Sequence, residues 1–94
     1  MNNEEALDLL NQELAVFRGE SYTDLTNLVS KRSLEFERSA PSGAKYQVEI
    51  QFVWDARPGG DIRVMSSIDD GRWRAFLPLS RSFIKSADGS FVGE

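Results

Sequence analysis

The sequence contains no cysteine and no histidine. Without cysteine the chain has no disulfide, no thiol nucleophile and no thiolate metal site. Without histidine it lacks the usual general base near neutral pH and the commonest transition-metal ligand. Ser-His-Asp and Cys-His catalytic arrangements are therefore excluded within the chain, and no tightly bound transition metal is expected. An enzyme would have to rely on carboxylates, lysine, tyrosine or a hard oxygen-bound metal, so we expect a non-catalytic protein without a cofactor.

Long hydrophobic runs and a basic leader are also missing. No apolar run approaches the roughly 18 residues needed to cross a bilayer. The first five residues, Met1-Asn2-Asn3-Glu4-Glu5, are acidic where a secretory signal would be basic. These features predict a cytoplasmic protein without a membrane partner. The length of 94 residues, with no internal repeat or low-complexity segment, predicts one domain over residues 1–94.

The net charge of −4 is unevenly distributed. Acidic residues outnumber basic ones in residues 1–44, whereas the two kinds balance in residues 45–94. Phosphate neutralisation requires clustered basic residues, and the first half has no such cluster. Nucleic-acid binding is therefore not expected, although Arg63, Arg72 and Arg74 can share a local patch.

The clearest positive feature is the alternation in residues 45–54. Every even position is large and apolar, and every odd position except Val53 is polar: Lys45-Tyr46-Gln47-Val48-Glu49-Ile50-Gln51-Phe52-Val53-Trp54. Successive side chains of a strand point to opposite faces, so five large apolar groups share one side. The pattern predicts a central strand with one buried face.

Two helices are predicted before this strand. In residues 3–17 the apolar side chains recur at helical spacing, and Gly19 follows as a terminator. Ser21 is placed to cap a second, shorter helix that ends near Lys31.

Four strands and a C-terminal extension are predicted after the helices. The predicted strands cover residues 34–38, 45–54, 62–68 and 72–77, separated by turns rich in glycine, proline and aspartate. Residues 79–84 fit either a helical turn or a bulged strand, and the C-terminal residues are too apolar to be free. The order predicts an α+β fold, with two N-terminal helices packed on one face of a four- to five-stranded antiparallel meander sheet.

The two faces of the predicted sheet differ in character. The predicted buried face carries Leu34, Phe36, Tyr46, Val48, Ile50, Phe52, Trp54, Ile62, Val64, Ile68, Trp73 and Leu77. The other face is largely charged, with an apolar island of Val53, Met65 and Phe76. One interpretation is a solvated face on which acids of the first two strands pair with arginines of the last two. The other is a contact surface for a protein partner or a homodimer, and its candidate residues are Val53, Arg63, Met65, Arg74 and Phe76.

Three functional hypotheses remain, and no motif identifies a family. The first is a small non-catalytic protein-interaction or regulatory module of unknown partner, one version of which is an inhibitor or immunity-like protein whose acidic surface masks a basic partner. The second is a small-molecule-binding or carboxylate-dependent enzymatic domain with a pocket between helices and sheet. The third is a homo-oligomeric structural subunit. The loop aspartates and the glycine-rich turn at residues 57–60 are interpreted as turn formers rather than as metal or phosphate ligands.

Overall fold

The computed structural model describes residues 1–71 and 78–94, and within them it has the predicted α+β fold. The elements in order are α1 (Asn3–Arg18), α2 (Tyr22–Val29), β1 (Leu34–Ser39), β2 (Lys45–Trp54), β3 (Ile62–Asp69) and β4 (Leu79–Lys85). The strands form an antiparallel sheet in the order β1-β2-β3-β4, which is the predicted meander.

Both helices begin at side-chain caps. The Asn2 side chain accepts a hydrogen bond from the Glu5 N–H at 3.0 Å, and the Ser21 hydroxyl accepts one from the Asp24 N–H at 3.0 Å. These bonds satisfy amides that the first turn of a helix leaves without a partner. The second helix ends at Val29, slightly before the predicted end near Lys31.

The fourth strand differs from the prediction. The segment 72–77, which the sequence pattern marked as a strand, lies outside the described residues. In the part of the chain that is described, the second neighbour of β3 is the strand Leu79–Lys85. The sequence of residues 79–84 is compatible with either a helical turn or a bulged strand, and the structure has a strand there. After β4 the chain turns, and an isolated bridge joins Lys85 to Phe91, so the C-terminal residues dock on the sheet as expected.

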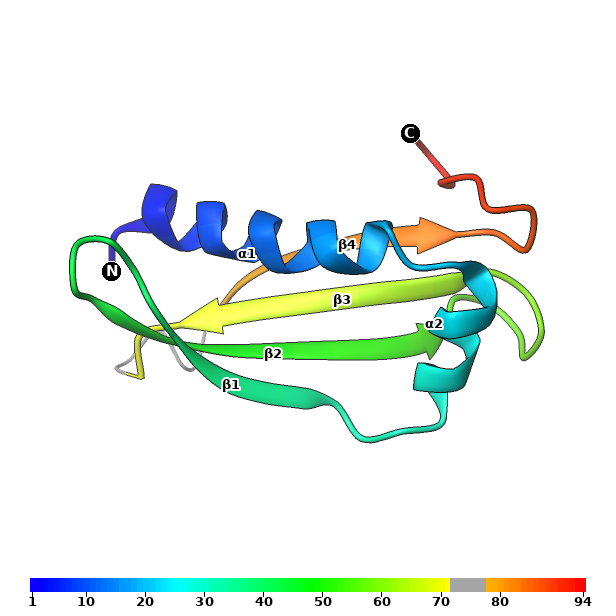
Figure 1. Ribbon diagram of the computed structural model, residues 1–94, viewed down its shortest axis with the longest axis horizontal. Helices are drawn as coiled ribbons and strands as arrows, with labels where there is room; N and C mark the ends of the chain where they lie inside the picture. The colour runs from blue at the N-terminus through cyan, green and yellow to red at the C-terminus, as the bar shows by residue number, and fades with distance from the viewer. Residues whose placement is uncertain (72–77) are drawn as a thin grey trace.

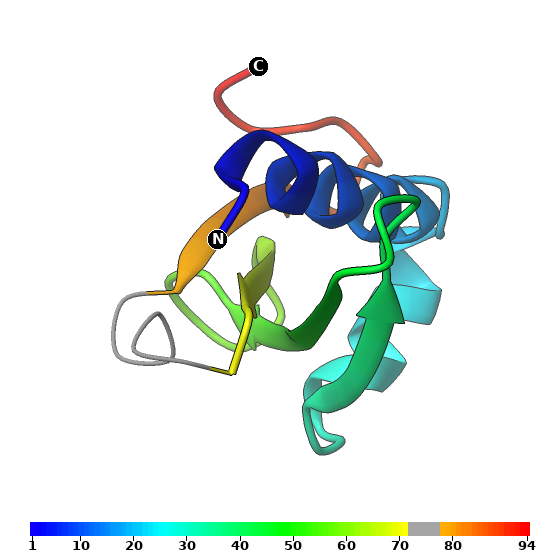
Figure 2. The same cartoon turned by 90° about the vertical axis from the view of Figure 1, so that its left-hand side faces the viewer.

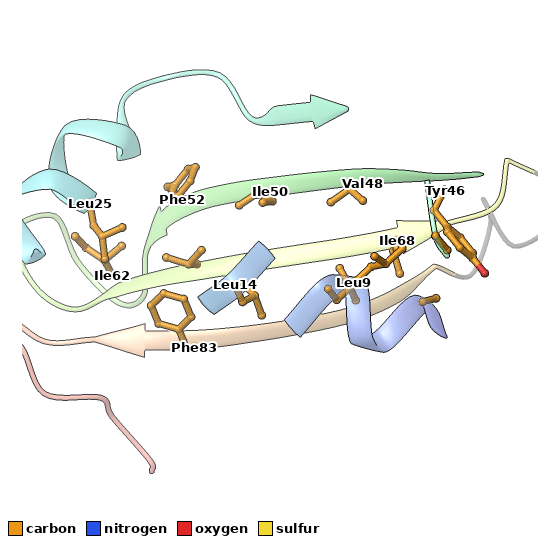
Figure 3. Close-up of a cluster of buried hydrophobic side chains, with 14 residues drawn as sticks. Leu9, Leu14, Leu25, Tyr46, Val48, Ile50, Phe52, Ile62, Ile68 and Phe83 are labelled. Atoms are coloured by element: carbon orange, nitrogen blue, oxygen red, sulfur yellow. The ribbon is translucent and has the colours of Figure 1, made fainter. Parts of the chain in front are cut away.

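The helices and the sheet form two layers. α1 runs along the sheet and contacts β3 and β4, whereas α2 lies at one end against β2 and β3 (Figure 1). Seen end-on, the sheet curves around α1 (Figure 2). The buried side chains of β2, β3 and β4 point toward the helix between the layers (Figure 3). The core comprises Ala6, Leu9, Leu10, Leu14, Leu25, Ala40, Tyr46, Val48, Ile50, Phe52, Ile62, Val64, Ile68 and Phe83.

Part of the predicted buried face is not buried. Leu34 is 40% exposed, because it begins an edge strand and the helices lie over the other three strands. Phe36 and Trp54 are only partly buried. The predicted core residues Trp73 and Leu77 lie outside the described residues.

Candidate functional site

The second face of the sheet, which we call the open face, has no described helix on it (Figure 2). Its side chains are the outward-pointing ones, and the strand register sets them in rows. One row places Arg63 of β3 between Val53 of β2 and Ile84 of β4. The next row places Met65 between Gln51 and Ser82. Three of the predicted contact residues, Val53, Arg63 and Met65, are therefore neighbours on one surface.

An apolar island lies on the open face toward the end where β2 finishes and β3 begins. In the described residues it consists of Val53, Met65 and Ile84, each of which is partly exposed to solvent. Phe76, the third member predicted from the sequence, lies outside the described residues. Beside Met65 lies a surface pocket of about 170 Å³ whose lining includes Gln51 and Ser67.

Arg63 is fixed within the island by two neighbours. Its Nε lies 2.9 Å from a carboxylate oxygen of Asp55, and its Nη1 donates to the Ser82 hydroxyl at 3.2 Å. These two bonds hold the planar guanidinium in one orientation.

An acidic group adjoins the island. Glu35 of β1 is directly opposite Glu49 of β2, and the hydrogen bond between these two carboxyls raises the pKa of Glu49 above its ordinary value. Burial and the negative charge of Glu35 raise this pKa further, whereas a hydrogen bond with Ser33 lowers it. A surface pocket of about 360 Å³ next to them is also lined by Asp69. This end of the open face is negative and attracts cations.

The predicted pairing of these acids with arginines of the last two strands is wrong for the described residues. The register places Ser67, and not an arginine, opposite Glu49. Arg63 lies farther along β3, and its carboxylate partner comes from the loop after β2. The open face therefore has an acidic end and an apolar, arginine-bearing end.

Two predicted contact residues, Arg74 and Phe76, lie outside the described residues. The structure adds Ile84 and Ser82, which the sequence did not indicate. Phe83 and Ile84 are adjacent apolar residues, so the alternation that identifies a strand face is interrupted there. Once β4 is known, the parity of its residues assigns Ile84 to the open face.

A separate polar cluster connects the start of α1 to β2. A single Glu5 carboxylate oxygen accepts hydrogen bonds from the hydroxyls of Ser42 and Tyr46, both at 2.8 Å. Burial, followed by the bond to Glu5 and the charges of Glu5 and Asp70, raises the pKa of Tyr46 to about 12. The phenol is therefore a hydrogen-bond donor at neutral pH, and the cluster joins helix to sheet.

Two of the loop aspartates serve the turns, as the sequence predicts, whereas the Asp55 side chain binds Arg63. Asp69 accepts the Gly71 N–H at 2.7 Å, and Asp88 accepts the Ser90 N–H at 2.8 Å. Among the residues described, no three His, Cys, Asp or Glu side chains form a group suited to a metal ion. The absence of a bound transition metal stays a prediction.

Comparison with models of known protein families, with curated proteins and with solved structures finds no match to this chain. No helix in the described ranges has the length and apolar character needed to cross a membrane.

Proposed function

We propose that the protein is a small non-catalytic protein-interaction or regulatory module, and that the open face is its contact surface. The observation that carries this proposal is the apolar island. Val53, Met65 and Ile84 come from three neighbouring strands, yet they gather in two adjacent rows around Arg63. Grouped apolar side chains beside a fixed arginine are the composition found at the centres of protein interfaces.

The other exposed apolar residues do not gather in this way. Val16 on α1 is 60% exposed, more than any member of the island, but scattered apolar residues are normal on protein surfaces. The open face is therefore distinguished from the outer side of α1 by the grouping of its apolar side chains, and not by how exposed each of them is.

The acidic end of the face suggests the chemistry of the partner. Glu35, Glu49 and Asp69 lie next to the island and share a pocket lining. A basic partner is steered toward such a surface before the apolar groups meet. This arrangement supports the inhibitor or immunity-like version of the proposal, in which the open face covers a basic surface of another protein.

The alternative of a ligand or active site between helices and sheet has weaker support. Packed apolar side chains of the core fill the space between the layers. The larger pockets lie at the surface instead. The one of about 340 Å³ near Tyr46 contains polar groups that already bond to one another through Glu5. Groups so paired are poorly placed to converge on a ligand.

A charge introduced at Met65, within the island, tests the proposal. The Met65→Glu variant is expected to keep its circular-dichroism spectrum, because Met65 lies outside the core. It should bind its partner about thirtyfold more weakly, or about 2 kcal/mol, if Met65 lies in the desolvated centre of the interface. Sedimentation measures self-association, and titration calorimetry measures affinity for a partner retained from a lysate of the producing cells.

Val16→Glu is the matched control, because it places the same charge on an exposed apolar residue of α1. It should leave both measurements unchanged. If Met65→Glu also leaves the mass and the affinity unchanged, the open face is ordinary solvated surface and the proposal is wrong.

A further inference from the structure

Among the described residues, the outer edge of β4 is open over most of its length. β4 is the last strand of the sheet, and its far side has no neighbouring strand among the described elements. Only its carboxyl end is paired there, through the bridge between Lys85 and Phe91. Ser80, Arg81 and Ser82, farther back along the strand, are all exposed.

The main-chain groups of β4 alternate between its two edges. In an antiparallel ladder each residue turns its N–H and C=O to the same side, and the next residue turns them to the other side. The Val92 N–H donates to the Ile84 C=O at 2.8 Å, on the side away from β3. Ile84 therefore faces the outer edge, and so do Ser82 and Ser80.

These outward groups have almost no partner within the described part of the chain. In that part of the chain, the one hydrogen bond to these groups is a long one of 3.4 Å, from Arg81 Nη1 to the Ser80 C=O. Two N–H and two C=O groups, spaced for a strand, thus face outward at Ser80 and Ser82. The bond from Val92 shows that a C=O on this same edge already accepts a main-chain N–H.

The charge of Arg81 decides against a second copy as that strand. The antiparallel self-pairing that uses both serines joins Ser80 of one copy to Ser82 of the other, and it places the two Arg81 side chains directly opposite. Like charges in this position are destabilising, and inward-pointing charges on edge strands are a known protection against self-pairing. No carboxylate in the described ranges forms an ion pair with Arg81.

We infer that β4 binds an extended segment of a partner protein as an added strand, with an acidic residue opposite Arg81. The residues on either side of that acid point to the open face, next to Ser80 and Ser82. Apolar side chains there extend the island formed by Met65 and Ile84. Main-chain bonds supply affinity in such strand addition, and alternate side chains supply specificity. The inference rests on the proposed function and adds to it the route by which the partner engages.

Proline at position 82 tests this route, because it removes an outward N–H and leaves the bonds between β3 and β4 in place. Ser82→Ala is the matched control, since it also loses the bond to Arg63 but keeps the N–H. The probe is a blocked six-residue peptide of alternating valine and glutamate, titrated by fluorescence anisotropy. A valine–lysine peptide serves as the charge control.

The glutamate peptide should bind Ser82→Pro at least about tenfold more weakly than Ser82→Ala, because the two variants differ in the outward N–H and both lack the Ser82 hydroxyl. The lysine peptide should bind weakly, and Arg81→Glu should reverse this preference. If Ser82→Pro does not fold, N-methylation of the peptide main chain tests the same bonds on the wild type, and binding should again be lost.

The inference is overturned if the glutamate peptide binds Ser82→Pro and Ser82→Ala equally. It is also overturned if the wild type binds the glutamate and lysine peptides equally, or binds neither at millimolar concentration. The proposed function is tested separately, by Met65→Glu, and it is retained after any of these results if Met65→Glu weakens partner binding. An effect of Met65→Glu without one of Ser82→Pro therefore identifies the face, and not the edge, as the contact.

Discussion

Phe52 and Gln51 are neighbours in β2, yet the sheet gives them opposite surroundings. Phe52 is 6% exposed, and its ring meets that of Phe17 on α1 edge-on, with the centroids 5.1 Å apart. Gln51 points to the open face and is partly exposed. Alternate pointing of side chains along a strand thus separates a core residue from a surface residue one position away.

This contrast predicts very different losses of stability. Phe52→Ala should lower the free energy of unfolding by about 3–5 kcal/mol, because burial is lost and a cavity remains. Gln51→Ala should change it by no more than about 0.5 kcal/mol. Urea titrations of both variants measure these values, and equal losses would contradict the register of β2.

Glu49 leads to a prediction about pH. Its folded-state pKa is raised by Glu35, so the folded protein retains a proton that the unfolded chain releases. The carboxyl therefore favours folding below its ordinary pKa of 4.5 and opposes folding as the pH rises through its raised folded-state pKa. Glu49→Gln should stabilise the protein by about 0.5 kcal/mol near neutral pH, and the gain should vanish at about pH 4.

Urea titrations at both pH values test this expectation. Glu37→Gln is the control, because Glu37 has Lys45 within 4.0 Å and no opposing acid directly across the strand. It should give no stabilisation at neutral pH. A Glu49→Gln gain that persists at acidic pH would show that the repulsion from Glu35 is not its cause.

β4 contacts the C-terminal end of α1 through a buried lysine. Lys85 is 8% exposed, and its ammonium donates to the main-chain carbonyls of Glu20 at 2.6 Å and Arg18 at 3.3 Å. Its Nζ also lies 5.2 Å from the centre of the Phe91 ring. The Arg18 carbonyl is the last of α1, where carbonyls lack partners within the helix and carry partial negative charge, so a cation is stabilising there; the Glu20 carbonyl lies in the loop that follows.

Replacing this lysine should loosen the end of α1. Lys85→Met retains the apolar part of the side chain but leaves the two carbonyls unpaired, at an expected cost of about 1–3 kcal/mol. Urea titration measures the loss, and hydrogen exchange should accelerate in the last turn of α1. Lys45→Met, at a lysine whose side chain is 68% exposed, should be nearly neutral. Equal effects of the two substitutions would mean that the carbonyl contacts contribute little.

The elements differ in how far the sequence predicts them. β2 has uninterrupted alternation, and its observed bounds match the prediction over residues 45–54. β4 was ambiguous because Phe83 and Ile84 interrupt the pattern and because Lys85, a charged residue, occupies an inward position. Its role depends on contacts with α1 that are distant in sequence, and local patterning does not contain them.

At the scale of the whole molecule, the helices cover one face of the sheet, and no described helix lies on the other (Figure 2). Val53, Arg63 and Met65 were assigned to that open face from strand parity alone. Ile84 and Ser82 required the placement of β4. The position of Glu35 directly opposite Glu49 depends on the register between β1 and β2. The alternation of the sequence predicts which face each side chain lies on, but not which residue of the neighbouring strand is its partner.

The central claim, that the open face contacts a protein partner, is tested most directly by crosslinking at its centre. A photoreactive amino acid is placed at position 65 and, in a second variant, at position 16 of α1. Both variants are irradiated in the cells that produce the protein, and adducts are resolved by mass. The account predicts one discrete adduct from position 65 that is absent from position 16. Adducts from position 16 alone, or the same diffuse products from both positions, would contradict it.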